Sequence, residues 1–132
     1  MAAETAKKFI DALHKLEAER DLETIASLFE ESAEVSNVLT EDRPMNARDF
    51  WQNYRDNFDT IKSSFRNEII TDDRAALEWV SEGTSSEGNE FKYSGVSILE
   101  IDGEKIKRFE AYFDPNNLGN QIVDEKTAEA NG

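Results

Sequence analysis

The spacing of apolar residues changes near the middle of the chain, and this change limits which folds are available. Up to about Ser63, apolar side chains recur three and four positions apart, as on one face of a helix. Beyond Ser63 they alternate with polar residues, as in half-buried strands. Helices gathered in one half of a chain and strands in the other predict an α+β domain.

Three helices are expected in the N-terminal half. Asp21 and Asn46 are suitable N-caps for the second and third helices. The apolar face of the first helix is Ala6, Phe9, Ile10, Leu13 and Leu16. That of the second is Leu22, Ile25, Ala26 and Phe29. The broad aromatic face of the third is Phe50, Trp51, Tyr54, Phe58 and Ile61.

One short strand and four longer ones complete the prediction. The short strand lies before the third helix and places Val35, Asn37 and Leu39 on one side. The four antiparallel strands are SSFRNEII, RAALEWVSEGT, EFKYSGVSILEI and EKIKRFEAYF, with a hairpin at Asp102-Gly103. We expect a cone-shaped, curved antiparallel sheet packed against the three helices and enclosing a pocket. Residues 1–115 form this domain, and residues 116–132 form an acidic, partly mobile tail that Ile122 and Val123 help to hold.

Composition narrows the classes of function. The 29 acidic and 15 basic residues give a net charge of -14, which disfavours nucleic acids and anionic membrane surfaces as partners. One histidine and no cysteine disfavour a metal site and exclude a thiolate nucleophile. Without a secretory signal or a stretch of ~20 apolar residues, a cytoplasmic protein that needs no cofactor is expected.

Four phrases, in this order and spacing, carry a family resemblance. They are FIDAL at 9–13, DLETIASLFEESAEV at 21–35, GVSILEIDGEKI at 95–106 and AYFDP at 111–115. The chain resembles SnoaL-like and ketosteroid-isomerase-like proteins of the nuclear transport factor two-like superfamily. The resemblance implies the cone fold, a pocket for a small molecule and, in many relatives, a homodimer.

The same resemblance implies that the usual catalytic acids are replaced. Ketosteroid isomerases place a tyrosine and two aspartates where this chain has Phe9, Asn37 and Ser97. Limonene-type epoxide hydrolases place a tyrosine at Val35 and an aspartate at Ala111, the last of which is also an acid position of SnoaL-type cyclases.

The arginine and aspartate of the epoxide hydrolases fall in the strand AALEWVSEG. They match Glu78 and Val80 or, one residue further along, Trp79 and Ser81. Neither register supplies an arginine-aspartate pair. In the cyclases a histidine matches Phe109, so none of the three reactions keeps its acids or bases.

Two residues remain as candidate catalytic groups. Asn37 could orient a carbonyl or a water, or it could be satisfied by local backbone. Glu78 would be a base if it points inward and a solvent-facing or interface carboxylate if it points outward. His14 is expected on the surface or at the rim of the pocket.

A pocket is expected to be lined by aromatic and small polar residues, although the aromatic side chains could instead fill the core. The predicted ligand-binding residues are Asn37, Trp51, Tyr54, Phe58, Trp79, Tyr93, Ser97, Phe109, Ala111 and Phe113.

Three functions follow as alternatives. The first is a pocket protein that binds a small, largely apolar molecule. The second is a hydrolase, isomerase or lyase that uses Glu78 and Asn37. The third is a structural or protein-binding module. A homodimer is expected through the convex sheet face, where Val80, Val96, Ile98 and Tyr112 would lie.

Overall fold

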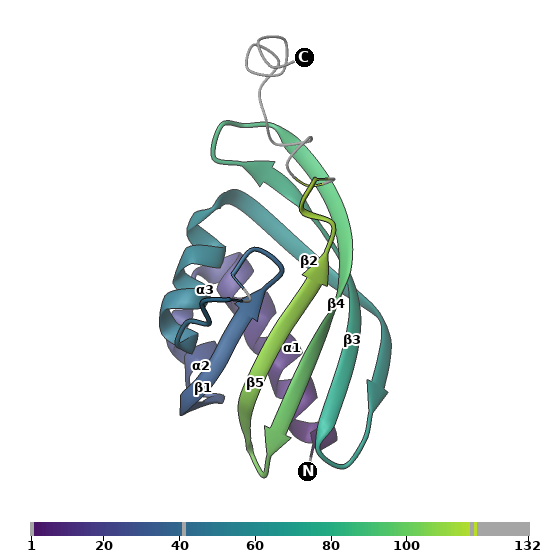
Figure 1. The fold of residues 1–132 in the computed structure, drawn as a ribbon. Coiled ribbons are helices and arrows are strands. Elements are labelled where there is room, and N and C mark those ends of the chain that lie inside the picture. Colours follow the sequence, from purple (N-terminus) through teal and green to yellow (C-terminus); the bar gives the residue numbers. More distant parts are fainter. Residues whose placement is uncertain (1, 41, 117, 119–132) are drawn as a thin grey trace.

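The computed structural model describes residues 2–40, 42–116 and 118. It contains three helices and five strands (Figure 1). The helices are α1 (Ala2–Glu19), α2 (Leu22–Ala26) and α3 (Ala47–Asp56). The strands are β1 (Phe29–Asn37), β2 (Phe58–Ile70), β3 (Arg74–Ser85), β4 (Glu90–Asp102) and β5 (Lys105–Phe113).

The strands form one curved sheet in the order β1-β5-β4-β3-β2. All neighbours are antiparallel except β1 and β5, which run parallel. The predicted α+β cone is therefore confirmed, with one parallel pair at its edge. No hairpin joins β1 to its neighbour in the sheet, so nothing local forces that pair to be antiparallel.

The predicted caps begin their helices. Asp21 accepts a hydrogen bond from the Thr24 amide at 3.1 Å, and Asn46 accepts one from the Asp49 amide at 2.9 Å. These bonds satisfy donors that the first helical turn leaves without partners. The helices therefore start where the sequence indicates.

Three predicted element boundaries are wrong. Phe29 begins β1 instead of closing the second helix, and Phe58 and Ile61 belong to β2 instead of α3. Pairing of Phe58 with Ser85 on β3 replaces the helical continuation. The short strand ends at Asn37, whose Oδ1 accepts the Leu39 amide at 2.8 Å, so Leu39 lies in a turn.

The helices cover the concave side of the sheet (Figure 1). Phe9 and Leu16 of α1 are buried against the inward residues of the strands, among them Leu77 and Leu99. The core thus lies between α1 and the sheet. None of the described helices is long and apolar enough to cross a membrane. Most of the predicted tail, including Ile122 and Val123, lies outside the described residues.

Candidate functional site

A cavity of about 310 Å³ lies between the helices and the concave face of the sheet. This volume is near the lower end of the range for small-molecule sites. All ten residues predicted to form the pocket line it: Asn37, Trp51, Tyr54, Phe58, Trp79, Tyr93, Ser97, Phe109, Ala111 and Phe113. The structure brings this set together, and its binding of a ligand stays a prediction.

Strand β3 supplies the back wall. Its residues alternate in burial, with Trp79 and Ser81 buried and lining the cavity. Glu78 and Val80 are only partly buried and point to the convex side. The register of this strand is therefore the one that places Trp79 and Ser81 inward.

The candidate base Glu78 does not reach the cavity. Its carboxylate accepts hydrogen bonds from Asn67 and, at 3.2 Å, from Arg66, both on the neighbouring strand. The hydrogen bond from Asn67, followed by that from Arg66, lowers the pKa of Glu78. The hypothesis that Glu78 acts as an inward base is wrong, because alternation along β3 turns its side chain away.

Ser97 is a hydrogen-bond donor inside the cavity. The Trp79 indole Nε1–H donates to Ser97 Oγ at 2.9 Å, so the Ser97 hydroxyl keeps its own proton for another acceptor. Gly95 makes room for the indole, because a Cβ there would lie 2.7 Å from Trp79 Cζ2 and 2.3 Å from the Tyr112 carbonyl oxygen. The missing side chain at Gly95 thus leaves the space that the Trp79 indole occupies in the cavity wall.

The Asn37 side chain is hydrogen-bonded to local groups and also faces the cavity. Its Oδ1 accepts from the Leu39 amide at 2.8 Å and from Thr40 Oγ1 at 3.4 Å, which fixes the turn after β1. Its side-chain nitrogen is the donor that remains for a ligand, since Asn37 also lines the cavity.

A buried carboxylate lies directly behind the cavity wall. Glu17 of α1 is 4% exposed. Its Oε1 accepts the Ser63 amide at 2.9 Å, and its Oε2 accepts Ser63 Oγ at 2.6 Å and Tyr54 Oη at 2.8 Å. Ser63 Oγ lies 2.6 Å from Ser81 Oγ. Tyr54, Ser63 and Ser81 line the cavity, so they connect it to Glu17.

The two phenols near this carboxylate resist ionisation. Burial, followed by the charge of Glu17, raises the pKa of Tyr54 well above its usual value. The same two causes, in the same order, raise the pKa of Tyr93. Both phenols therefore stay neutral, and the Tyr54 hydroxyl donates to Glu17.

Glu17 is not among the residues predicted from the sequence, although a signal for it was present. Glu17 stands four positions after Leu13 and eight after Phe9, on the apolar face of α1. A charged residue on such a face is buried only when it has partners. Its partners come from β2 and α3, far along the chain.

The single histidine plays no part in a serine-histidine pair with Ser97. His14 is exposed, and its Nε2 lies 3.0 Å from the Ser63 carbonyl oxygen. Within residues 2–40, 42–116 and 118, no group of three histidine, aspartate or glutamate side chains could hold a metal ion. None of the described residues that line the cavity carries a formal charge.

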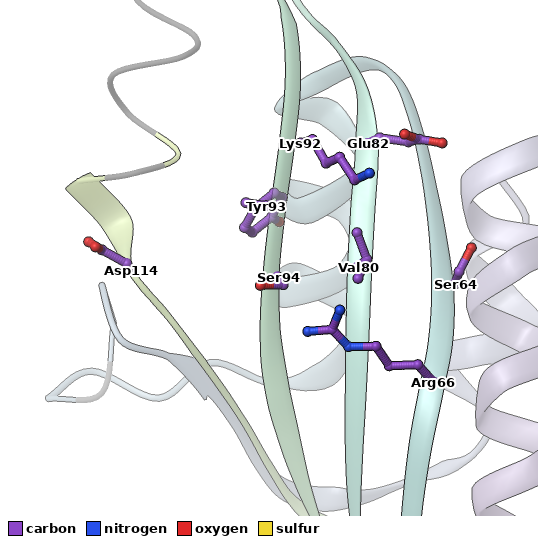
Figure 2. Close-up of a pocket in the computed structure, with 8 residues that line it drawn as sticks. All are labelled: Ser64, Arg66, Val80, Glu82, Lys92, Tyr93, Ser94 and Asp114. Carbon is purple, nitrogen blue, oxygen red and sulfur yellow. The ribbon is translucent and has the colours of Figure 1, made fainter.

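A second hollow, of about 640 Å³, opens on the convex face (Figure 2). Figure 2 shows outward side chains of β2, β3 and β4 beside one another, with the Arg66 side chain extending over β3 near Val80. Charged groups of both signs surround it, including Glu82 and Lys92. It lies on the sheet surface and shares one lining residue, Tyr93, with the cavity.

The sequence profile of the SnoaL-like domain matches residues 6–109. A search of curated proteins finds no match to this sequence.

Solved structures share the fold at low sequence identity. An NTF2-like protein from Anabaena variabilis ATCC 29413 is 17% identical with a TM-score of 0.78, over 89% of this chain and 92% of that one. An M. tuberculosis LEH-like epoxide hydrolase is 12% identical with a TM-score of 0.71, over 98% and 95%.

A third structure contains a small molecule. A hypothetical protein with a ketosteroid isomerase-like fold from Catenulispora acidiphila DSM 44928, in complex with trimethylamine, is 13% identical. Its TM-score is 0.74, over 86% of this chain and 91% of that one. At such identities these likenesses concern the fold, since one fold hosts many functions.

Proposed function

Because the chain belongs to the family of SnoaL-like domains, we propose that it binds a small, largely apolar molecule in the cavity between its helices and its sheet. The observation that carries this proposal is the cavity of about 310 Å³ with aromatic walls and a few neutral polar groups. Apolar walls supply affinity, and a small number of placed donors fix orientation. A protein of this fold was solved with trimethylamine, so a small ligand has a precedent in the fold.

The polar groups favour a ligand with at least one hydrogen-bond acceptor. The Ser97 hydroxyl and the Asn37 side-chain nitrogen both have protons to donate. Leaving such groups unpaired in a dry complex costs about 1–3 kcal/mol each, so a pure hydrocarbon is a poorer ligand than one with an oxygen or nitrogen acceptor.

The proposed function is ligand binding without catalysis. The enzyme hypothesis relied on Glu78 as a base, and Glu78 lies on the convex face. A reaction that moves a proton needs a titratable group within hydrogen-bond reach of the substrate. The described residues that line the cavity include no carboxylate, imidazole or amine.

Filling the cavity tests the proposal. Ala111→Leu adds three carbons at a lining position of β5, whereas Ala18→Leu adds the same carbons on the exposed side of α1. Titration with a neutral probe, N-phenyl-1-naphthylamine, is expected to saturate in the wild type and in Ala18→Leu and to weaken at least tenfold in Ala111→Leu. Equal affinity in all three would place the probe outside the cavity and contradict the proposal.

We also propose that two copies pair through the convex sheet face. Val80, Val96 and Ile98 are only half-buried there, and Tyr112 is 42% exposed. Ion pairs flank them, with Arg66 to Glu78 at 3.2 Å and Arg108 to Glu100 at 2.8 Å. A two-fold partner would bring the same alternation of charge and apolar surface, which suits a self-complementary interface.

Light scattering tests the pairing. A particle of twice the 15.0 kDa chain mass is expected for the wild type, and a particle of 15.0 kDa for Val96→Glu, because the new carboxylate would be buried without a counter-charge. A wild-type particle of 15.0 kDa at micromolar concentration would rule out the dimer.

A further inference from the structure

The carboxylate behind the cavity wall has the hydrogen-bond pattern of an ionised group. Glu17 receives one backbone N–H and two hydroxyl groups, all between 2.6 and 2.9 Å. An ionised carboxylate can accept from all three of these donors at once. In its ionised form Glu17 places a negative charge behind the cavity wall.

No cation among the described residues forms an ion pair with this charge. The ion pairs of residues 2–40, 42–116 and 118 involve other acids. The guanidinium of Arg55 is close enough for its charge to interact with that of Glu17, but it donates its hydrogen bonds to the carbonyl oxygens of Phe58 at 2.9 Å and Asp59 at 3.3 Å. His14 contacts the Ser63 carbonyl oxygen.

The field of Glu17 extends into the cavity. Burial raises the pKa of Tyr54 and Tyr93 most, the charge of Glu17 raises both pKa values further, and both phenols line the cavity. Hydrogen bonds connect the carboxylate to the cavity through Tyr54, Ser63 and Ser81, which all line it. In a water-poor site such a field is screened weakly, so it favours a positive ligand.

The walls suit the same class of ligand. Trp79, Tyr93 and Phe113 form a three-ring set with centroid separations of 5.1, 5.4 and 6.3 Å and steeply inclined planes. All three rings line the cavity, and a cation placed over the face of an aromatic ring is attracted by the ring's quadrupole. The described lining residues include no lysine, arginine or histidine that would repel a cation.

We propose that the preferred ligand of the cone is an organic ammonium ion, a tertiary or quaternary amine on an apolar body, with its positive end toward Tyr54, Ser63 and Ser81 and its charge balanced by Glu17. This ligand class rests on the proposed function, because it requires that the cavity binds a small molecule. The net charge of -14 also attracts cations to the protein as a whole.

Two ligands of the same shape, one charged and one neutral, distinguish the contribution of the ligand's charge to affinity from that of its hydrophobic burial. The cation is 3-hydroxyphenyltrimethylammonium, and its neutral counterpart is 3-tert-butylphenol. Isothermal titration with the full chain at neutral pH is expected to give at least tenfold tighter binding for the cation. An anion of similar shape, 3-tert-butylbenzoate, is expected to bind at least tenfold more weakly than the neutral phenol.

Glu17→Gln locates the source of the preference. The amide keeps the size of the side chain and removes its charge, so the advantage of the cation over the phenol is expected to fall below threefold. Glu19→Gln, on the exposed side of the same helix, removes one charge as well and is expected to keep the full preference. The comparison among the three ligands in the wild type stands even if Glu17→Gln fails to fold.

The outcomes distinguish this inference from the function on which it rests. If the phenol binds as tightly as the cation, the ammonium ligand is refuted while small-molecule binding stands. If Glu17→Gln folds and keeps the preference, the assignment to Glu17 is refuted. If no probe binds with perturbation of lining residues in NMR spectra, the proposed function itself fails.

Discussion

Replacing Gly95 by alanine is expected to disturb the cavity through a single added carbon. An alanine Cβ at this position would lie 2.3 Å from the Tyr112 carbonyl oxygen and 2.7 Å from Trp79 Cζ2. The oxygen belongs to the neighbouring strand and cannot rotate away. The indole can leave only by breaking its 2.9 Å hydrogen bond to Ser97.

The expected loss follows from these contacts. Overpacking of a well-filled site costs about 1–3 kcal/mol, and a clash with backbone belongs in the upper half of that range. A loss of about 2 kcal/mol in the free energy of unfolding corresponds to a melting temperature about 7 °C lower for a domain of this size. The probe affinity of the cavity is expected to fall with it, because Trp79 is part of the wall.

Urea denaturation and near-ultraviolet circular dichroism measure the two effects. Ser94→Ala is the matched control, because Ser94 is exposed on the same strand and its loss is expected to change stability by less than about 0.5 kcal/mol. If Gly95→Ala matches the control in stability and keeps the wild-type indole signal, Trp79 is not held against Gly95 and the reasoning is refuted.

Two further predictions concern titratable groups. Tyr54 and Tyr93 have pKa values raised by burial, so folding favours their protonated forms; this stabilisation is complete below pH 10 and is lost at higher pH. The free energy of unfolding is expected to fall by about 1.4 kcal/mol per pH unit for each phenol, and a flat denaturation profile up to about pH 11 would contradict this. Glu78→Gln is expected to leave probe affinity unchanged within threefold, because Glu78 faces the convex side, and a larger change would return it to the cavity.

Alternation in the sequence predicted much of the cavity. Phe109, Ala111 and Phe113 share one side of a strand whose period of two is unbroken, and all three line the cavity. The resemblance to SnoaL-like proteins indicated that this side of the strand faces the pocket. Local caps such as Asp21 could be read directly, because each acts within one turn.

Other features depended on contacts that no local pattern contains. The helical spacing from Phe50 continues through Phe58 and Ile61, yet pairing with β3 takes both into a strand. Alternation around Glu78 showed that neighbouring residues of this strand lie on opposite faces of the sheet. It did not show which of the two faces the first helix covers, so the direction of the Glu78 side chain stayed open. Glu17 has a buried site only because Tyr54 and Ser63 reach it from 37 and 46 positions further along the chain.

The cavity has two polar ends, one at Ser97 and one at Ser63 and Ser81, and the sheet register places them apart. Their separation determines where a ligand needs its own polar groups. Ser97 pairs with Leu77, and Ser63 pairs with Ser81, so the two sites lie four residues apart along β3, or roughly 13 Å. Effects at sites more than about 7–10 Å apart that share no partner usually add. The losses of affinity in Ser97→Ala and Glu17→Gln for 3-hydroxyphenyltrimethylammonium are therefore expected to sum in the double variant. A double loss smaller than the sum by tenfold or more would mean that both groups act on one end of the ligand, and the separation of a donor end from an anionic end would be wrong.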